Sequence, residues 1–248
     1  MICEVILLVG KLLIGVIVVF FLIIKSQKMV WAHGIWFVRR YDAWQMVLRD
    51  GCIDHGYAPE MVTNVSGYDA DGKKIEVVAI PHGTYITINA SENLSVAVVS
   101  FDYGLWSNQL DGTWVNAPMN EVMGATIGTH ALKYSVNYFS SVKKIQPIAE
   151  IPLQIVPLSD PTSLKAGEML TVQVLYKGKP MSGADVISDF IQQPAMTVKS
   201  DDDGKVNVAV NSDMNVIGIE IAFNYKQKTE MATRDKICAT LSFTAQEK

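Results

Sequence analysis

The chain has 248 residues, enough for one large domain or two ordinary ones, and its 49% hydrophobic and 19% charged residues exclude a disordered protein. The hydrophobic residues are concentrated at the start, where 24 of the residues in 1–32 are apolar. Three of the 21 basic and one of the 25 acidic residues lie there, which leaves 18 basic and 24 acidic residues, net −6, in the remainder. Because a nucleic-acid-binding protein needs a basic surface, this balance argues against DNA or RNA as a partner.

The N-terminal segment has the features of an export signal. Residues 12–24 form an unbroken apolar run preceded by a lysine, and Val30 and Ala32 supply the small residues expected at −3 and −1 of a cleavage site. This pattern predicts cleavage between Ala32 and His33. The alternative is a retained anchor helix, because the apolar stretch 5–24 is long enough to span a bilayer. Both interpretations predict that the rest of the chain is exported.

After the leader, apolar and polar residues alternate with a period of two, and no long helical pattern occurs. This alternation predicts an all-β protein. The predicted strands are residues 35–39, 43–48, 62–68, 73–80, 84–89, 94–102, 113–115, 132–139, 153–157, 170–176, 184–191, 196–199, 205–210, 216–223 and 237–243. Five turn signals separate neighbouring strands: Asp71-Gly72, His82-Gly83, Asp111-Gly112, Lys177-Gly178 and Asp203-Gly204.

Many short strands spaced about ten residues apart are typical of β-sandwiches, and the length suits two of them. The proline-containing segment 140–152 is the expected boundary, which predicts one sandwich over 33–145 and a second over 150–248. Within the second, residues 177–186 and 200–206 follow the pattern xGxPxxGAxV … xDxDGxxxV. This pattern resembles the immunoglobulin-like or prealbumin-like modules of exported bacterial proteins.

Two cysteines remain after the leader, Cys52 and Cys238. They could form a disulfide in an oxidising compartment, or both could remain unpaired thiols. Cys238 lies in the predicted strand 237–243, whose Ile, Ala, Leu and Phe side chains share one face, so the cysteine is expected on the polar face.

Few segments carry the motifs of chemical sites. Asp201, Asp202 and Asp203 precede a glycine, but they lack the alternating spacing and the downstream glutamate of a calcium loop, so we expect a solvated hairpin turn. No nucleophile elbow, zinc-protease motif, phosphate loop or dinucleotide fingerprint is present. An enzyme is therefore not expected.

All four histidines, His33, His55, His82 and His130, lie in the first predicted sandwich. His55 and His82 adjoin glycines and fit exposed turns, whereas His130 opens a predicted strand. Cleavage after Ala32 would give His33 a free α-amino group, and this amine and its imidazole could chelate one transition-metal ion. The other imidazoles are candidates to complete such a site; the simpler interpretation is that His33 is merely the first mature residue.

The tryptophans Trp36, Trp106 and Trp114 allow two interpretations. Trp106 and Trp114 could form a wall that stacks on a glycan or a metal chelate. The interpretation we favour is that all three fasten hairpins to a sandwich core.

The segment Ala32-His33-Gly34-Ile35-Trp36-Phe37-Val38 resembles the start of a family of exported bacterial proteins of unclear function, described as periplasmic components of nickel or cobalt uptake systems. Further segments resemble that family in order along the chain: residues 65–73, 102–107, 111–116, 130–135, 153–157 and 215–217. The resemblance implies a periplasmic protein that handles Ni²⁺ or Co²⁺ beside a membrane metal transporter. It supports His33 and His130, which lie in matched segments, and leaves His55 and His82 as candidates by proximity.

These observations lead to three expectations of function. The first is a non-catalytic nickel- or cobalt-binding protein of the periplasm, with His33 as the chelating residue and His130 as the first additional ligand. The second is a structural or adhesion-like protein of the cell envelope that binds no metal. The third is a copper-binding carrier, because a terminal-histidine chelate also suits Cu²⁺. Residues 5–24, where the leader is retained, could anchor the protein to the inner membrane.

Overall fold

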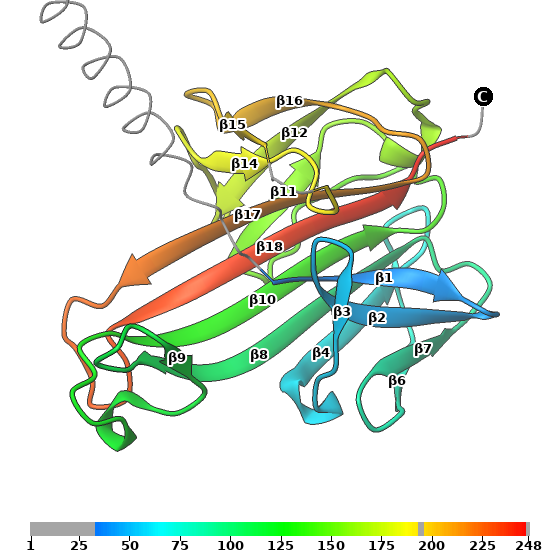
Figure 1. Ribbon diagram of the computed structural model, residues 1–248. Coiled ribbons are helices and arrows are strands. Elements are labelled where there is room, and N and C mark those ends of the chain that lie inside the picture. Colours follow the sequence, from blue (N-terminus) through cyan, green and yellow to red (C-terminus); the bar gives the residue numbers. More distant parts are fainter. Residues whose placement is uncertain (1–32, 193–195, 247–248) are drawn as a thin grey trace, which may run out of the picture. The chain divides into compact units, whose positions relative to one another are not determined.

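The computed structural model describes residues 33–192 and 196–246 (Figure 1). The predicted leader, its cleavage site after Ala32 and the possible anchor over 5–24 lie outside the described residues. Within the described part, no helix has the length and apolar character needed to cross a membrane.

The described residues form strands and three short 3-10 helices, which confirms the all-β expectation. In chain order the elements are β1 Gly34–Arg40, β2 Ala43–Asp50, β3 Ile53–His55, η1 Pro59–Met61, β4 Val62–Tyr68, β5 Lys74–Ile75, β6 Val77–Pro81, β7 Ile86–Ala90, β8 Val96–Asn108, β9 Trp114–Val115, η2 Met119–Glu121, β10 Gly128–Tyr138, β11 Leu153–Pro157, η3 Pro161–Ser163, β12 Met169–Tyr176, β13 Lys179–Pro180, β14 Asp185–Ile187, β15 Thr197–Lys199, β16 Lys205–Ala209, β17 Met214–Asn224 and β18 Arg234–Thr244.

The period-two alternation located most strands correctly, and β4 and β11 have the predicted bounds. Two short strands, β3 and β13, were missed because each has too few residues to show an alternation. The predicted strand 184–191 is shortened to β14, while β8, β10, β17 and β18 extend beyond their predicted ends.

The glycines of the five predicted turns all have positive φ. The turn Lys177-Gly178 joins β12 to β13 with φ of 50° and 74° at its two residues. Two consecutive positive φ values are the geometry of a two-residue hairpin turn, which glycine adopts without steric cost.

The strands form three sheets (Figure 1). A five-stranded sheet has the order β1-β2-β7-β6 with β3 on β2, and a four-stranded sheet has the order β11-β12-β13 with β16 on β12. The nine-stranded sheet between them, called the middle sheet here, has the order β15-β14-β17-β18-β10-β8-β4-β5 with β9 on β8.

The middle sheet combines strands from both predicted sandwiches. β10 from the 33–145 part pairs in parallel with β18 from the 150–248 part over ten residue pairs. The described residues accordingly belong to one compact unit, Ala32–Lys248. The segment 140–152 connects β10 of the middle sheet to β11 of the four-stranded sheet. The two predicted sandwiches therefore share the middle sheet.

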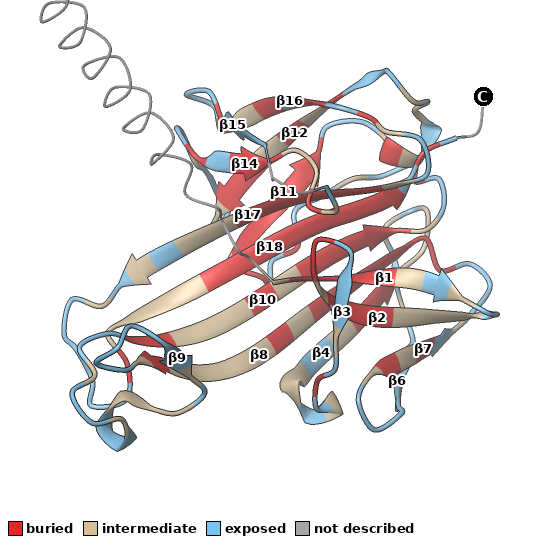
Figure 2. Ribbon diagram, in the orientation of Figure 1, coloured by how far each residue is buried: buried red, intermediate tan, exposed pale blue. Residues whose placement is uncertain are grey.

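Each face of the middle sheet carries a hydrophobic core, and its buried residues lie mainly in the first half of β8 and β17 and in the second half of β10 and β18 (Figure 2). In β8, Val96 and Val98 contribute to the core under the four-stranded sheet, whereas Ala97 and Val99 contribute to the core under the five-stranded sheet. Alternate residues of a strand point to opposite faces, so a strand covered on both sides must be apolar at nearly every position.

The face of β18 that was expected to be polar is buried. Ile237, Ala239 and Leu241 share the face toward the four-stranded sheet, as predicted. Cys238 points the other way, but it is only 2% exposed because the five-stranded sheet and the segment around Phe190 cover it. Cys238 and the exposed Cys52 are both unpaired in the structure.

Polar side chains on this second face bind the backbone of the edge strand β1. Thr240 Oγ1 donates to the carbonyl of Ile35 at 2.5 Å, and the amide of Phe37 donates to Asn137 Oδ1 at 2.9 Å. A buried edge strand needs such partners, because an unpaired backbone group in the interior is costly. The start of β1, next to His33, is thereby held against the middle sheet.

Candidate functional site

The structure brings two of the four histidines together. His33 lies immediately before β1, and His55 is the last residue of β3. Both of these strands pair with β2. The ring centroids of His33 and His55 are 4.8 Å apart, with the ring planes at 72°. We call this arrangement the His33–His55 pair.

The His33–His55 pair has the spacing of two imidazoles that share a metal ion. A metal about 2 Å from one nitrogen of each ring holds the centroids about 4.5 Å apart at a right angle and about 6 Å apart in line. The observed 4.8 Å lies in this interval. In addition, His55 Nε2 is buried with no hydrogen-bond partner in the described part of the chain. A buried nitrogen in this state is costly unless a ligand satisfies it.

Electrostatics at His33 favour the neutral ring. Burial lowers the pKa of His33, and the nearby positive charge of Lys133 lowers it further, while Asp50 acts in the opposite direction. A lowered pKa leaves the imidazole unprotonated at neutral pH, which is the form that binds metals.

Lys133 is the unexpected member of this site. Its side chain extends from β10 toward the start of β1, and Nζ donates to the carbonyl of His33 at 2.6 Å. The residue is only 4% exposed, and Nζ lies 5.0 Å from the centre of the Tyr103 ring. Tyr103 in turn lies 6.0 Å from the His33 ring. The sequence suggested no such role, because a lysine in an alternating strand is expected on an exposed face.

His130 lies on the other face of the middle sheet. Because β10 pairs with β18 in an unbroken register, its side chains alternate regularly, and three positions separate His130 from Lys133. His130 Nε2 lies 2.9 Å from Asp102 Oδ1, and its Nδ1 lies 3.7 Å from Asp235 Oδ1. Asp235 also accepts a hydrogen bond from the hydroxyl of Tyr225 at 2.5 Å. The sheet therefore separates His130 from the His33–His55 pair, and its ring nitrogens face carboxylates.

His82 lies on the exposed turn that was expected for it. Its Nε2 lies 2.9 Å from Thr87 Oγ1, and its ring stacks on Tyr85 with the centroids 4.9 Å apart. These contacts within one hairpin account for its position without a ligand.

Across residues 33–192 and 196–246, no group of three or more His, Cys, Asp or Glu side chains has an arrangement that could hold a metal ion. The His33–His55 pair supplies two imidazoles. A third nitrogen, the α-amine of His33, becomes available only when the chain begins at His33.

The three tryptophans differ in environment. Trp36 is completely buried, and its ring packs edge-on against Phe190 with the centroids 6.0 Å apart, so the core interpretation is confirmed for this residue. It is wrong for Trp114, which is 43% exposed beneath the Arg234 guanidinium. Trp106 is half-buried and packs against Tyr103, with the ring centroids 5.1 Å apart.

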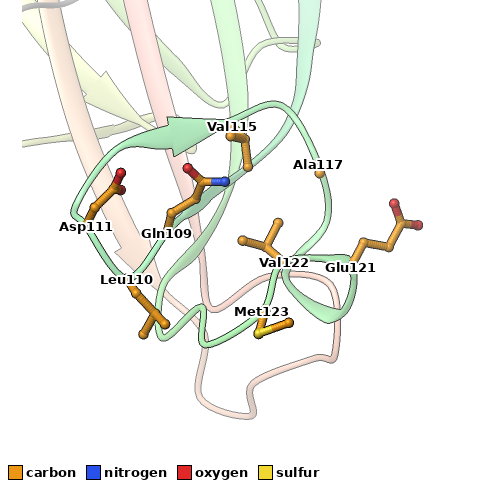
Figure 3. Close-up of a pocket in the computed structure, with 8 residues that line it drawn as sticks. All are labelled: Gln109, Leu110, Asp111, Val115, Ala117, Glu121, Val122 and Met123. Atoms are coloured by element: carbon orange, nitrogen blue, oxygen red, sulfur yellow. The ribbon is translucent and has the colours of Figure 1, made fainter.

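A separate pocket of about 510 Å³ lies among the loops at the end of β8 (Figure 3). It is lined by Gln109, Leu110, Asp111, Val115, Ala117, Glu121, Val122 and Met123. Leu110 and Met123 are strongly exposed, at 80% and 87%. The lining thus combines apolar and polar side chains, and the Asp111 carboxylate accepts bonds from the amide and hydroxyl of Thr113 within the turn.

The acidic run forms a tight turn that connects β15 of the middle sheet to β16 of the four-stranded sheet, so the predicted turn is present but its flanking strands do not pair as a hairpin. Asp201 Oδ1 accepts hydrogen bonds from the amides of Asp203 and Lys205, at 3.0 and 2.7 Å. An aspartate that bonds to amides two and four residues ahead closes a tight turn, as the sequence predicted.

A family described as a domain of unknown function (DUF4198) matches residues 30–214. The match begins just before His33 and includes strands of all three sheets. Comparisons with curated proteins and with solved structures give no match. The match agrees with the part of the resemblance that implied a family of uncharacterised function. Because it spans well over half of the chain, this protein belongs to the DUF4198 family.

Proposed function

We propose that the exported protein binds a divalent transition-metal ion at a mature N-terminus that begins with His33, and that it does so as a non-catalytic carrier. The observation that carries the proposal is the His33–His55 pair, with ring centroids 4.8 Å apart and His55 Nε2 buried without a partner. Together with the α-amine of His33, these rings supply three nitrogen donors.

The donor set and the resemblance each bear on the metal. Imidazole and amine nitrogens suit Ni²⁺, Co²⁺ and Cu²⁺. The resemblance to nickel and cobalt uptake proteins favours Ni²⁺ or Co²⁺, with a membrane metal transporter as the partner and the periplasm as the compartment. Cu²⁺ is the second candidate, because three neutral nitrogens bind it most tightly in the general affinity order.

His130 and His82 are not part of this proposal. The middle sheet separates His130 from the pair, and His82 is held by Thr87 and Tyr85. Substitutions of His130 and His82 therefore serve as matched controls. Each removes an imidazole but leaves the three proposed donors, the rings of His33 and His55 and the α-amine, in place.

The proposal predicts how substitution changes metal affinity. The protein is expressed with its leader, recovered after export, and its intact mass is determined before titration with Ni²⁺, Co²⁺ and Cu²⁺. We expect a species that begins at His33 and binds one ion. His33→Ala and His55→Ala each weaken binding by about 100-fold or more, since removal of even an outer-sphere partner costs 10- to 100-fold. His82→Ala and His130→Ala retain the wild-type affinity.

Affinity is also expected to rise with pH. The α-amine has a pKa of about 8, and it must lose its proton to bind the metal. Binding at about pH 8 should thus be tighter than at about pH 6. A protein that keeps residues 1–32 and binds none of the three ions above background would refute the proposal and favour a structural role in the cell envelope.

A further inference from the structure

The strand β6 forms an open edge of the five-stranded sheet. It is the last strand in the order of that sheet, and among the described strands it pairs with β7 alone (Figure 1). Its apolar side chains reach the surface, since Val78 is 49% exposed and Ile80 is 39% exposed. An exposed apolar edge strand is a template on which another extended chain can pair.

The hairpin of β6 and β7 shows which backbone groups face the open edge. The amide of His82 donates to the carbonyl of Tyr85 at 2.8 Å, so these residues form a hydrogen-bonded pair. Such pairs occur at every second position of an antiparallel ladder, so Ile80 and Val78 also direct their backbone groups toward β7. The remaining residues of β6 direct theirs toward the open edge: Val77, Ala79 and Pro81.

The β6 edge lacks the charged side chains that usually prevent pairing with other chains. Residues 77–91, which include β6, its turn and β7, contain no Lys, Arg, Asp or Glu. The two end strands of the middle sheet differ in this respect, because β5 carries Lys74 and β15 carries Lys199. Lysines on edge strands oppose association, so β6 is the less protected edge.

We propose that β6 is a dimerisation edge, which pairs antiparallel with β6 of a second copy of this chain about a two-fold axis at Ala79. The two five-stranded sheets then form one continuous sheet. This surface is separate from the His33–His55 pair, so the proposal does not depend on metal binding.

The backbone of β6 is complementary to itself in this register. Within residues 33–192 and 196–246, no hydrogen bond outside the strand ladders is found for the amides of Val77 and Ala79. About the proposed axis, Ala79 of each copy donates to the carbonyl of Ala79 in the other, and Val77 donates to the carbonyl of Pro81. Pro81 has no N–H, so every donor of the open edge obtains an acceptor.

The side chains on the outer face are complementary in the same register. Val78 of one copy lies opposite Ile80 of the other, so the exposed apolar side chains cover one another on both sides of the axis. Next to them, the exposed Glu76 lies opposite the exposed His82 of the other copy, and no like charges meet. An axis at Val78 would instead place Ile80 opposite Glu76. This self-complementarity is the reason why a second copy is the partner.

The size of the contact predicts a weak dimer. Pairing along one strand of five residues covers less surface than the roughly 1,200–2,000 Å² of a stable interface. We therefore expect a dissociation constant of about 0.1–1 mM.

Sedimentation equilibrium of the exported protein tests the proposal. EDTA and a reductant exclude association through metal ions or through the exposed Cys52. Between about 10 µM and about 1 mM the average mass should rise from monomer toward dimer and not beyond, because two-fold pairing uses up the edge. A protein that stays monomeric at about 1 mM, or that forms open-ended oligomers, would overturn the proposal.

A lysine on the edge should prevent this association. Ile80→Lys places a charge opposite Val78 twice in each dimer, and we expect it to weaken dimerisation at least tenfold. Val198→Lys is the matched control, since Val198 is a 42% exposed valine on the edge strand β15. It should dimerise like wild type, whereas wild-type dimerisation of Ile80→Lys would contradict the proposal. Circular dichroism checks that each variant is folded.

A disulfide tests the position of the axis. In a background of Cys3→Ser and Cys52→Ser, Ala79→Cys should form a covalent dimer on mild oxidation. Residues in a hydrogen-bonded pair have Cα atoms about 5.5 Å apart, within the range that a disulfide spans. Asn89→Cys is the control, because Asn89 is exposed on β7, one strand away from the edge. Equal yields from the two cysteines would refute the pairing of β6 with itself.

Discussion

At the residue scale, the surroundings of His33 lower the pKa of its imidazole, mainly through burial. Its ring contacts His55 and lies near Tyr103, and its carbonyl accepts a hydrogen bond from the buried Nζ of Lys133. Each contact involves a residue far away in the sequence or on another sheet. The sequence could therefore identify His33 as a candidate but could not identify its neighbours.

The lowered pKa of His33 predicts a pH dependence of stability. A histidine whose folded-state pKa lies below the unfolded value of about 6.5 binds fewer protons when folded, so unfolding takes up a proton in this range. The free energy of unfolding should thus fall as the pH decreases from about 7 to about 5. Urea midpoints across this range should fall less steeply in His33→Gln than in wild type. The same replacement at exposed His82 is the control, and equal slopes for wild type and His33→Gln would contradict the argument.

At the scale of elements, β1 shows how an edge strand is held by side chains of another sheet. Asn137 accepts a bond from the Phe37 amide and donates to the Ala97 carbonyl at 3.2 Å, and Ser242 Oγ donates to Asn137 Oδ1 at 2.7 Å. Asn137 is completely buried, so its bonds replace those that water would make.

Replacement of Asn137 should loosen this attachment. Asn137→Leu keeps the branched shape and the number of side-chain heavy atoms, but the amide of Phe37 and the hydroxyl of Ser242 lose their acceptor inside the protein. The expected loss of unfolding free energy is about 1–3 kcal/mol for a buried group left unsatisfied. Chemical denaturation measures it, with Asn207→Leu as the control. Asn207 bonds to Thr171 on the surface, so its replacement should change stability by less than about 0.5 kcal/mol.

The strands themselves were largely predictable, and the exceptions have physical reasons. Alternation is a local property, so it located β4 and β11 without reference to the rest of the chain. It misjudged the second face of β18, where Thr240 and Ser242 suggested solvent. These hydroxyl groups are buried because they bind the backbone of β1 and the side chain of Asn137, which no local pattern reveals.

At the scale of the whole molecule, the middle sheet makes the two halves interdependent. Its β10–β18 pair joins residues more than 100 positions apart in the sequence, and the two cores lie on opposite faces of the same sheet. If the two halves were separated at the segment 140–152, each would keep only part of the middle sheet, and β10 and β18 would each have an exposed edge.

This arrangement predicts the behaviour of separated halves. Residues 33–145 and 150–248, expressed alone, should lack a cooperative thermal transition, because each loses its partner across β10 and β18. Mixed together, they should recover a cooperative transition at a lower midpoint than the intact chain. Circular dichroism melts measure both. Cooperative melting of either fragment alone would mean that it is an independent domain.

The sequence by itself determined what depends on neighbouring residues: the all-β class, the position of most strands, the glycine turns and the candidate histidines. The tertiary structure decided what depends on pairing between distant segments: the shared middle sheet, the placement of His130 behind it, and the meeting of His33, His55 and Lys133. The physical reason is that a strand's alternation records only which residues share a face. Which strand or sheet covers that face is set by hydrogen bonding and packing over the whole chain, so the His33–His55 pair and its buried lysine neighbour form only when β1, β3 and β10 come together.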